Sequence, residues 1–188
     1  MRALAVIVAM LILAGCGFHL RTAQEDHLPP RFANLRVTMS GSGLRYPKVV
    51  LVMRRMLRDH GASVFSGQVP LPTLALMGET LTPVVVSINN SGGAAAYLLD
   101  YTLSFVLLDA KGRAILGPET IRVQREYNFN PLNILSMARE KRYIENRMRR
   151  SAARQIVARI IAFGRRQSAA RAEYPSAPPP PFTTRHAH

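Results

Sequence analysis

Cys16 is the only cysteine in this 188-residue sequence, and it directly follows a short apolar segment and two small residues. One positive charge, Arg2, precedes the apolar segment, residues 3–13, which is roughly half as long as a membrane-spanning helix. A basic start, a short apolar stretch and small residues at its end are typical of a secretory signal peptide. The four residues that end this segment, Leu13-Ala14-Gly15-Cys16, have the pattern of a bacterial lipobox. We therefore expect a diacylglycerol on the thiol and cleavage of the chain before Cys16.

A buried free cysteine is the alternative interpretation, because cysteine is among the most buried residue types. It does not explain why the sole cysteine lies where the apolar segment stops. Lipidation of Cys16 would leave the mature chain without another thiol, so no disulfide is expected. Gly17 follows the cysteine. An aspartate at that position commonly retains lipoproteins in the inner membrane, so its absence predicts export to the outer membrane.

The arginines of the last predicted helix are the second group with possible chemistry. Six of them fall between residues 142 and 159, namely Arg142, Arg147, Arg149, Arg150, Arg154 and Arg159. Glu140 and Glu145 are the only acids nearby. Any one of these arginines is best explained as part of a solvated helix face. As a group they could bind the phosphate groups of a lipid through bidentate hydrogen bonds, with Arg149, Arg150 and Arg154 as candidates.

The net charge of +14 also points to an anionic partner. Such a charge usually indicates nucleic acid, but an exported lipoprotein meets little of it. We therefore expect no nucleic-acid partner, and instead a phosphorylated lipid or an acidic glycan of the cell envelope. The apolar content of 48% is sufficient for a folded core.

No arrangement of residues in the sequence supports catalysis or metal binding. The five histidines have no carboxylate or cysteine at metal-ligand spacing in a structured element; they are His19, His27, His60, His186 and His188. Asp100 and Asp109 do not form a plausible proton-transfer pair. No glycine-rich phosphate loop opens either predicted helix. The sequence predicts a protein that is not an enzyme, with no metal and no cofactor other than the lipid on Cys16.

Alternating and helical apolar patterns predict the elements that would carry these residues. Strands are expected at residues 33–39, 74–89, 97–109 and 113–127, and the third of these shows the clearest alternation. A helix is expected from Pro47 to Gly61. A second helix is expected to begin at Asn130-Pro131 and to end at Phe163 or Gly164, with a buried face at steps of four: Ile144, Met148, Ala152, Ile156 and Ile160.

The order of these elements predicts an α+β two-layer sandwich. Two amphipathic helices would pack on one face of a four-stranded, mainly antiparallel sheet, burying the apolar sides of both layers. The predicted organisation is a signal peptide at 1–15, a lipidated tether at 16–31, the α+β domain at 32–164, and a disordered proline-rich basic tail at 165–188.

The chain resembles a known family, the lipopolysaccharide-assembly lipoproteins LptE (RlpB) of Gram-negative bacteria, over roughly residues 13–161. The most specific match is a six-residue run, Cys16-Gly17-Phe18-His19-Leu20-Arg21. Further agreement lies in Ala96-Tyr97 at the start of the long strand, in the order of elements, and in the run before the last helix, Glu126-Tyr127-Asn128-Phe129-Asn130-Pro131.

The resemblance implies an outer-membrane lipoprotein that plugs the β-barrel of the transporter LptD, assists its folding, and contacts lipopolysaccharide in transit. It also makes the lipid A phosphates of lipopolysaccharide the expected ligand of Arg149, Arg150 and Arg154, although an acidic barrel wall or phospholipid headgroups would serve these arginines equally well. It implies neither catalysis nor a cofactor. In the family a basic residue in the loop between the second and third strands is tied to lipopolysaccharide binding, and that position is Asn90 here. A lysine near the start of the last helix corresponds to Met137, with Arg139 and Lys141 close by. The alternative function is a periplasm-facing lipoprotein that stabilises another envelope complex or binds acidic glycan.

Overall fold

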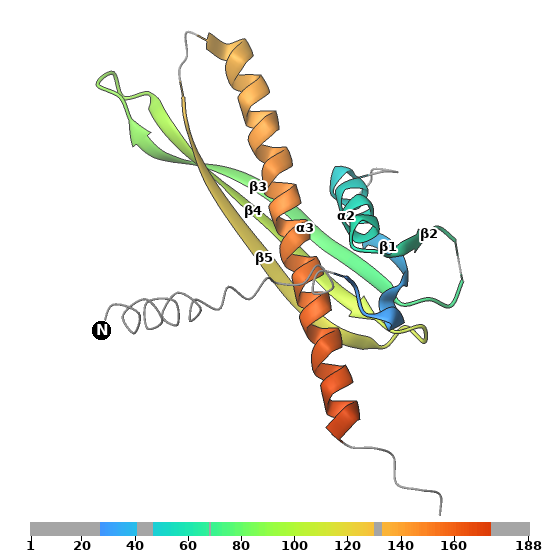
Figure 1. Cartoon of the computed structure of the whole chain (residues 1–188). Helices are drawn as coiled ribbons and strands as arrows, with labels where there is room; N and C mark the ends of the chain where they lie inside the picture. The colour runs from blue at the N-terminus through green and yellow to red at the C-terminus, as the bar shows by residue number, and fades with distance from the viewer. Residues whose placement is uncertain (1–26, 41–46, 68, 130–132, 174–188) are drawn as a thin grey trace, which may run out of the picture.

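The computed structural model describes residues 27–40, 47–67, 69–129 and 133–173. In chain order the elements are η2 (Pro30–Phe32), β1 (Asn34–Ser40), α2 (Lys48–Asp59), β2 (Ser63–Phe65), β3 (Thr73–Ile88), β4 (Ala94–Leu108), β5 (Ala114–Asn128) and α3 (Ile134–Glu173). Both helices lie on one face of a single sheet (Figure 1). The predicted two-layer α+β class is therefore confirmed.

The sheet has five strands rather than the four expected, in the order β2-β1-β3-β4-β5. It is also mixed, because β1 runs parallel to both β2 and β3, while β3, β4 and β5 are antiparallel. The missed strand, β2, has only three residues, too few for an alternating pattern to be recognised. It follows α2, and a helical crossover of this kind returns the chain parallel to the strand before it.

The core lies between the long strands and the helices. On β4, every second side chain from Leu99 to Leu107 is buried, as the alternation predicted. On α3, the predicted stripe at steps of four is buried at Met148, Ala152, Ile156 and Ile160. The spacing of apolar residues alone thus identified which faces meet.

Helix α2 covers the sheet beside α3 and closely follows the prediction. Pro47 occupies the position before its first residue, and Gly61 has a φ of +87°, a conformation that a residue without Cβ adopts without strain. Val49, Met53 and Leu57 are buried at steps of four. This face packs on β1 and β2, and the helix runs alongside α3.

Helix α3 is longer than predicted. It was expected to end at Phe163 or Gly164, but it continues to Glu173, so residues 165–173 of the predicted disordered tail are helical. Its 40 residues correspond to a length of about 60 Å. The predicted end of the helix was wrong because Gly164 does not cap the helix. Gly164 is instead buried within α3, at the point where Pro29 crosses the helix. Residues 130–132 and 174–188 lie outside the described part.

Residues 27–31, expected to belong to the lipidated tether at 16–31, are part of the folded body. Leu28 is 8% exposed and Phe32 is fully buried in the same cluster as the strands. The Leu28 amide donates a hydrogen bond to the His60 carbonyl oxygen at the end of α2. The predicted signal peptide and residues 16–26 lie outside the described residues.

The long strands extend past the smaller elements. β1 pairs with β3 only up to Met77, so the rest of β3 and the strands β4 and β5 continue as a ribbon toward the upper left of Figure 1. We call that end of the sheet, together with the first turns of α3, the distal end. The opposite end, where residues 27–32 cross α3, is the proximal end. Within the described residues, no helix is long and apolar enough to cross a membrane.

Candidate functional site

The β3–β4 hairpin forms the tip of the distal end. The Asn89 side-chain oxygen accepts hydrogen bonds from the backbone amides of Ser91 and Gly93, at 3.1 and 2.9 Å. These bonds hold the predicted turn, and Gly92 has the positive φ, +80°, that the turn requires. Asn90, the position the family resemblance indicated, is exposed at this tip.

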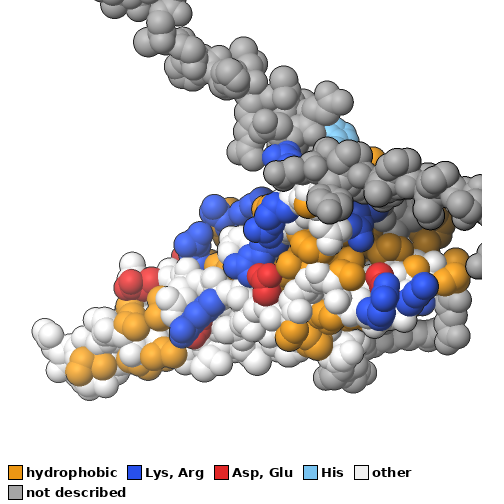
Figure 2. Space-filling model, turned by 90° about the horizontal axis from the view of Figure 1, so that it is seen from below, with side chains coloured by type: hydrophobic (Ala, Val, Ile, Leu, Met, Phe, Trp, Pro, Cys, Tyr) orange, Lys and Arg blue, Asp and Glu red, His pale blue; other side chains and the backbone are white. Residues whose placement is uncertain are grey.

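The strand that leads to the tip exposes an unusual run of apolar side chains. Val84, Val85, Val86 and Ile88 are between 46% and 68% exposed. Among the described strands, this part of β3 has β4 on one side and no neighbour on the other. An apolar strand edge without a neighbour promotes aggregation unless a partner covers it. The tip, at the left of Figures 1 and 2, is accordingly orange and white in the space-filling view.

An aromatic cluster lies on the helix side of the same ribbon. The rings of Tyr97 and Tyr127 stack with centroids 5.6 Å apart, and Phe129 meets Tyr97 edge-on at 5.5 Å. Burial, the neighbouring Tyr97, and Glu145 and Glu140 of α3 raise the pKa of Tyr127. The two internal runs that carried the family resemblance, far apart in sequence, therefore meet in space.

The first turns of α3 combine apolar and cationic side chains. Leu135 is 77% exposed and Tyr143 is 58% exposed, with the Arg147 guanidinium 5.7 Å from the Tyr143 ring centroid. Arg139 is exposed and Lys141 is half-buried, whereas Met137 is buried at 8% exposure. The distal end therefore offers apolar and basic groups together, which suits an amphipathic anionic ligand.

Arg149 differs from the exposed Arg150 and Arg154 because it faces the sheet and is largely buried. Its Nε donates to a Glu79 carboxylate oxygen at 2.7 Å, and the two side chains are only 13% and 17% exposed. Glu145 lies 3.8 Å from the same guanidinium. Arg149 was expected as a lipopolysaccharide ligand; the structure places it in a helix-to-sheet ion pair instead.

A bulge in β3 brings Glu79 to this position. Between Met77 and Thr80 the strand gains one residue relative to β4, and Gly78 has a φ of +57°. The extra residue turns Glu79 toward the helices, beside the buried Tyr101. Burial first, and then the Glu79 charge, raise the pKa of Tyr101. Sequence reasoning missed Glu79; a Gly-Glu pair within an apolar strand was the available signal.

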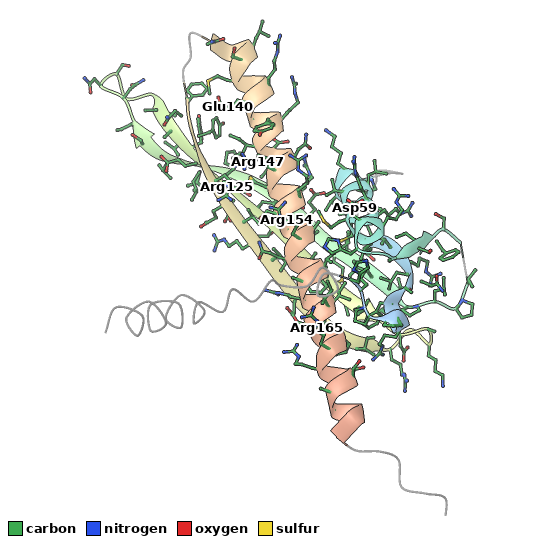
Figure 3. The ribbon with its side chains drawn as sticks, in the orientation of Figure 1. Asp59, Arg125, Glu140, Arg147, Arg154 and Arg165 are labelled. Carbon is green, nitrogen blue, oxygen red and sulfur yellow. The ribbon has the colours of Figure 1, made fainter. Side chains whose placement is uncertain are left out.

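Arg150 and Arg154 are both exposed on α3. Arg150 lines a groove of about 380 Å³ between the helices, together with Val52, Arg55, Met56 and Asp59 of α2. Figure 3 shows Arg147 and Arg154 on the middle of α3 and Asp59 on α2. Along the helix, residue 139 is about 22 Å from residue 154, so the predicted ligands do not form one site. Binding by Arg139, Lys141, Arg150 and Arg154 stays a prediction.

The sheet face opposite the helices is covered by no described element. By strand register it carries small hydroxyl side chains, joined in two cross-strand pairs: Thr80 with Thr102 at 2.6 Å, and Ser104 with Thr120 at 2.8 Å. Its central charges, Asp100 and Arg122, pair with each other, and the hydrogen bond from Arg122 lowers the pKa of Asp100. In Figure 2 blue side chains gather toward the upper, helix side, while the lower side is mainly white and orange.

The described residues contain no group of three or more His, Cys, Asp or Glu side chains placed to hold a metal ion. Cys16 and its lipobox lie outside the described residues, so lipidation stays a prediction. What the structure presents is a set of contact surfaces: an apolar hairpin, a sheet face rich in hydroxyl side chains, and basic helices. Surfaces of this kind are typical of a protein that binds or assembles with partners.

Comparison with known proteins identifies the family. The family model for lipopolysaccharide-assembly, LptE, matches residues 36–160, about two thirds of the sequence. The chain is 29% identical over 155 residues to the LPS-assembly lipoprotein LptE of Photorhabdus laumondii, and 30% identical over 156 residues to that of Pectobacterium atrosepticum. Each alignment covers 82% of this chain and 81% of the relative. The chain belongs to the LptE family, which is non-enzymatic, so the predicted family and the predicted absence of catalysis are confirmed.

Solved structures of low sequence identity share the fold. Rare lipoprotein B from Shewanella oneidensis superposes with a TM-score of 0.57 at 23% identity, over 74% of this chain and 98% of that one. Lipoprotein B from Nitrosomonas europaea gives 0.59 at 21% identity, over 78% and 95%. The two-layer arrangement is therefore not peculiar to this chain.

Proposed function

We propose that this chain is an outer-membrane lipoprotein that plugs the lumen of the LptD β-barrel, assists its assembly, and takes part in lipopolysaccharide transport. The observation that carries the proposal is the unpaired distal edge of β3, with its run of exposed valines beside a sheet face that no helix covers. Such a surface requires a protein partner. Membership in the LptE family makes LptD the first choice for that partner.

The uncovered sheet face has the chemistry that a barrel lumen would accept. Barrel interiors are polar, and this face presents hydroxyls and the Asp100–Arg122 ion pair at its centre, with Glu126 exposed nearer the distal end. It therefore places no unpaired charge against the barrel at its centre. The distal end would lie deepest, with its apolar tip and the arginines of α3 beside passing lipopolysaccharide.

Co-purification with the barrel tests the plug. After mild detergent extraction the wild-type chain should be recovered with LptD. Ser104→Arg, whose cross-strand neighbours Met77 and Thr120 carry no charge, puts a cation on the uncovered sheet face. It should reduce that recovery several-fold, because a desolvated charge without a partner is costly. Lys111→Glu, at the exposed proximal hairpin, is the control and should have little effect. Recovery of the wild type only as a monomer would favour the alternative, a lipoprotein serving another envelope complex.

Lipidation of Cys16 is part of the same proposal. Cys16→Ala should abolish both acylation and signal cleavage, because the sequence has no second sulfhydryl that could take the lipid. Mass spectrometry of the chain purified from membranes provides the measurement. The wild type should begin at an acylated Cys16, whereas the variant should retain residues 1–15 and carry no lipid. A wild-type chain with an unmodified first methionine would refute lipidation.

A further inference from the structure

The groove between α2 and α3 combines two arginines, one carboxylate and an apolar floor. Its volume is about 380 Å³, and it is lined by Val52, Arg55, Met56 and Asp59 of α2 and by Arg150 of α3. The four residues of α2 are spaced by three, one and three positions, so they lie along one face of that helix. In Figure 3, Asp59 lies on α2 beside the middle of α3. The volume of the groove is typical of a small-ligand site.

The charged side chains of this groove take no part in holding the fold together. Arg55, Asp59 and Arg150 are all exposed. Within the described part of the chain, the side chains of these three residues make no hydrogen bond and no ion pair, although two of them are cations and one is an anion. Arg149, the residue before Arg150, instead pairs with Glu79 of the sheet, because consecutive residues of a helix point about 100° apart. The charges at the groove are therefore available to a ligand.

The arrangement suits a ligand that carries an anionic and a cationic group close together. Arg55 and Asp59 lie one helical turn apart, about 6 Å along the axis of α2, and Arg150 reaches the same groove from α3. Guanidinium groups bind phosphate through paired hydrogen bonds, and a carboxylate accepts hydrogen bonds from a primary ammonium. The half-buried side chains of Val52 and Met56 add apolar surface. A phosphodiester joined by a short linker to an ammonium, with hydrocarbon attached, supplies all three kinds of group.

We propose that the groove binds one molecule of phosphatidylethanolamine. The phosphate lies between Arg55 and Arg150, and the ammonium group of the lipid lies on Asp59. The first methylenes of the acyl chains cover Val52 and Met56. Of the ligands that the sequence left open for Arg150, this one is a phospholipid headgroup rather than lipopolysaccharide or a barrel wall. Arg55 and Asp59 are the further residues of the site.

The tether keeps the groove near a bilayer that supplies such a lipid. The Leu28 amide donates a hydrogen bond to the carbonyl oxygen of His60, the residue after Asp59. Twelve residue steps separate Cys16 from Leu28, so a fully extended tether spans about 40 Å. A lipid on Cys16 therefore holds the end of α2 within one tether length of the membrane. The supply of lipid thus rests on the acylation of Cys16 proposed above, whereas the binding chemistry of the groove does not.

Native mass spectrometry of the chain in a maltoside detergent measures lipid binding directly. Phosphatidylethanolamine should bind about fivefold more tightly than phosphatidylglycerol with the same acyl chains, because phosphatidylglycerol has no ammonium for Asp59. Asp59→Asn should remove this preference. Arg55→Gln should weaken the binding of both lipids about fivefold, because it removes a partner of the phosphate. Arg58→Gln, at an exposed position of the same helix outside the groove, is the matched control and should change neither affinity more than about twofold.

Two further arms separate the lipid from its headgroup and the site from its helix. Free phosphoethanolamine should compete at least about tenfold less effectively than the lipid, because it has no hydrocarbon to cover Val52 and Met56. Arg150→Gln, on the facing helix, should repeat the loss seen for Arg55→Gln, which a disturbance confined to α2 would not do. Thermal unfolding of each variant shows whether the fold is retained.

Equal affinity of the wild type for the two phospholipids, or equal losses in Arg55→Gln and Arg58→Gln, would overturn the proposal. Equal competition by free phosphoethanolamine, or tighter binding of lipopolysaccharide that depends on Arg55, would also overturn it. Because no barrel is present in the assay, either result with continued recovery of LptD would remove this inference and leave the plug standing. Loss of LptD recovery with an intact lipid preference would remove the plug and leave the groove as a lipid site.

Discussion

Replacing Arg149 by methionine is expected to lower the free energy of unfolding by about 2–3 kcal/mol, because it leaves the Glu79 carboxylate without its cation in a nearly dry site. This loss of stability is smaller than that expected on breaking a fully buried ion pair, because the side chains of Arg149 and Glu79 are still 13% and 17% exposed. Methionine retains most of the apolar volume of the arginine stem. Urea denaturation of the wild type and the variant provides the measurement.

The double variant separates the charge from the packing. Glu79→Leu/Arg149→Met removes both charges and fills the same space, so its stability should return to within about 1 kcal/mol of the wild type. The double-mutant cycle should then give a coupling free energy of about 1–3 kcal/mol. Simple addition of the two single effects would show that Glu79 and Arg149 do not act as a pair.

A second ion pair between α3 and the sheet provides the matched control. Arg159 contacts Glu119 of β5, but these side chains are 42% and 35% exposed. Water screens this pair, so Arg159→Met should cost less than about 1 kcal/mol. The comparison keeps the helix, the sheet and the residue types of the pair and changes mainly burial, although Arg149 also has Glu145 at 3.8 Å. A similar loss at both sites would mean that Arg149 contributes through its aliphatic stem.

The sequence predicted those parts of the fold in which one local pattern decides the outcome. On β4, alternation from Tyr97 to Leu107 identified the buried face because that strand has a strand on each side and helices over one face only. The apolar residues at steps of four on α3 identified the buried face of that helix for the same reason. Both patterns report burial, and burial is what organises the two layers.

Elements that depend on distant contacts could not be predicted in this way. β2 exists because α2 returns the chain beside β1, not because its three residues prefer a strand. The inward turn of Glu79 depends on a bulge at Gly78, which reverses the parity of the residues after it. Without the bulge, alternation would place Glu79 on the uncovered face, so Arg149 would lack its partner and would resemble a ligand-binding arginine.

The candidate site was predicted better by motif than by charge. The two internal runs that identified the family converge at Tyr97, Tyr127 and Phe129, so their residue types are explained by one aromatic cluster under the start of α3. The number of arginines on α3 did not predict their environments. It led us to group Arg149, which pairs with Glu79 of the sheet, with Arg150 and Arg154, because a number of residues carries no information about how the helix is oriented.

Gly164→Ala is expected to destabilise the protein by about 1–2 kcal/mol, although alanine is the better helix former. The helix-propensity gain of about 1 kcal/mol favours alanine. Against it, the new methyl group would lie 2.2 Å from Cγ and 2.9 Å from Cβ of Pro29, and a proline ring cannot rotate away. Relief requires moving residues 28–32, which carry the buried Phe32 ring. Hydrogen exchange should show increased opening of this segment, and urea denaturation should show the net loss.

Two further variants determine whether the proline ring is the cause. Pro29→Gly removes all three ring atoms that the methyl group would meet, so Gly164→Ala should be neutral or stabilising in that background. Ala162→Gly, at an exposed position on the same helix, measures the propensity effect alone and should cost about 1 kcal/mol. If Gly164→Ala stabilises the wild type, the contact with Pro29 does not fix the segment. If the expected loss and its rescue are both observed, the glycine in the middle of α3 is what lets residues 28–32 pack against the helix.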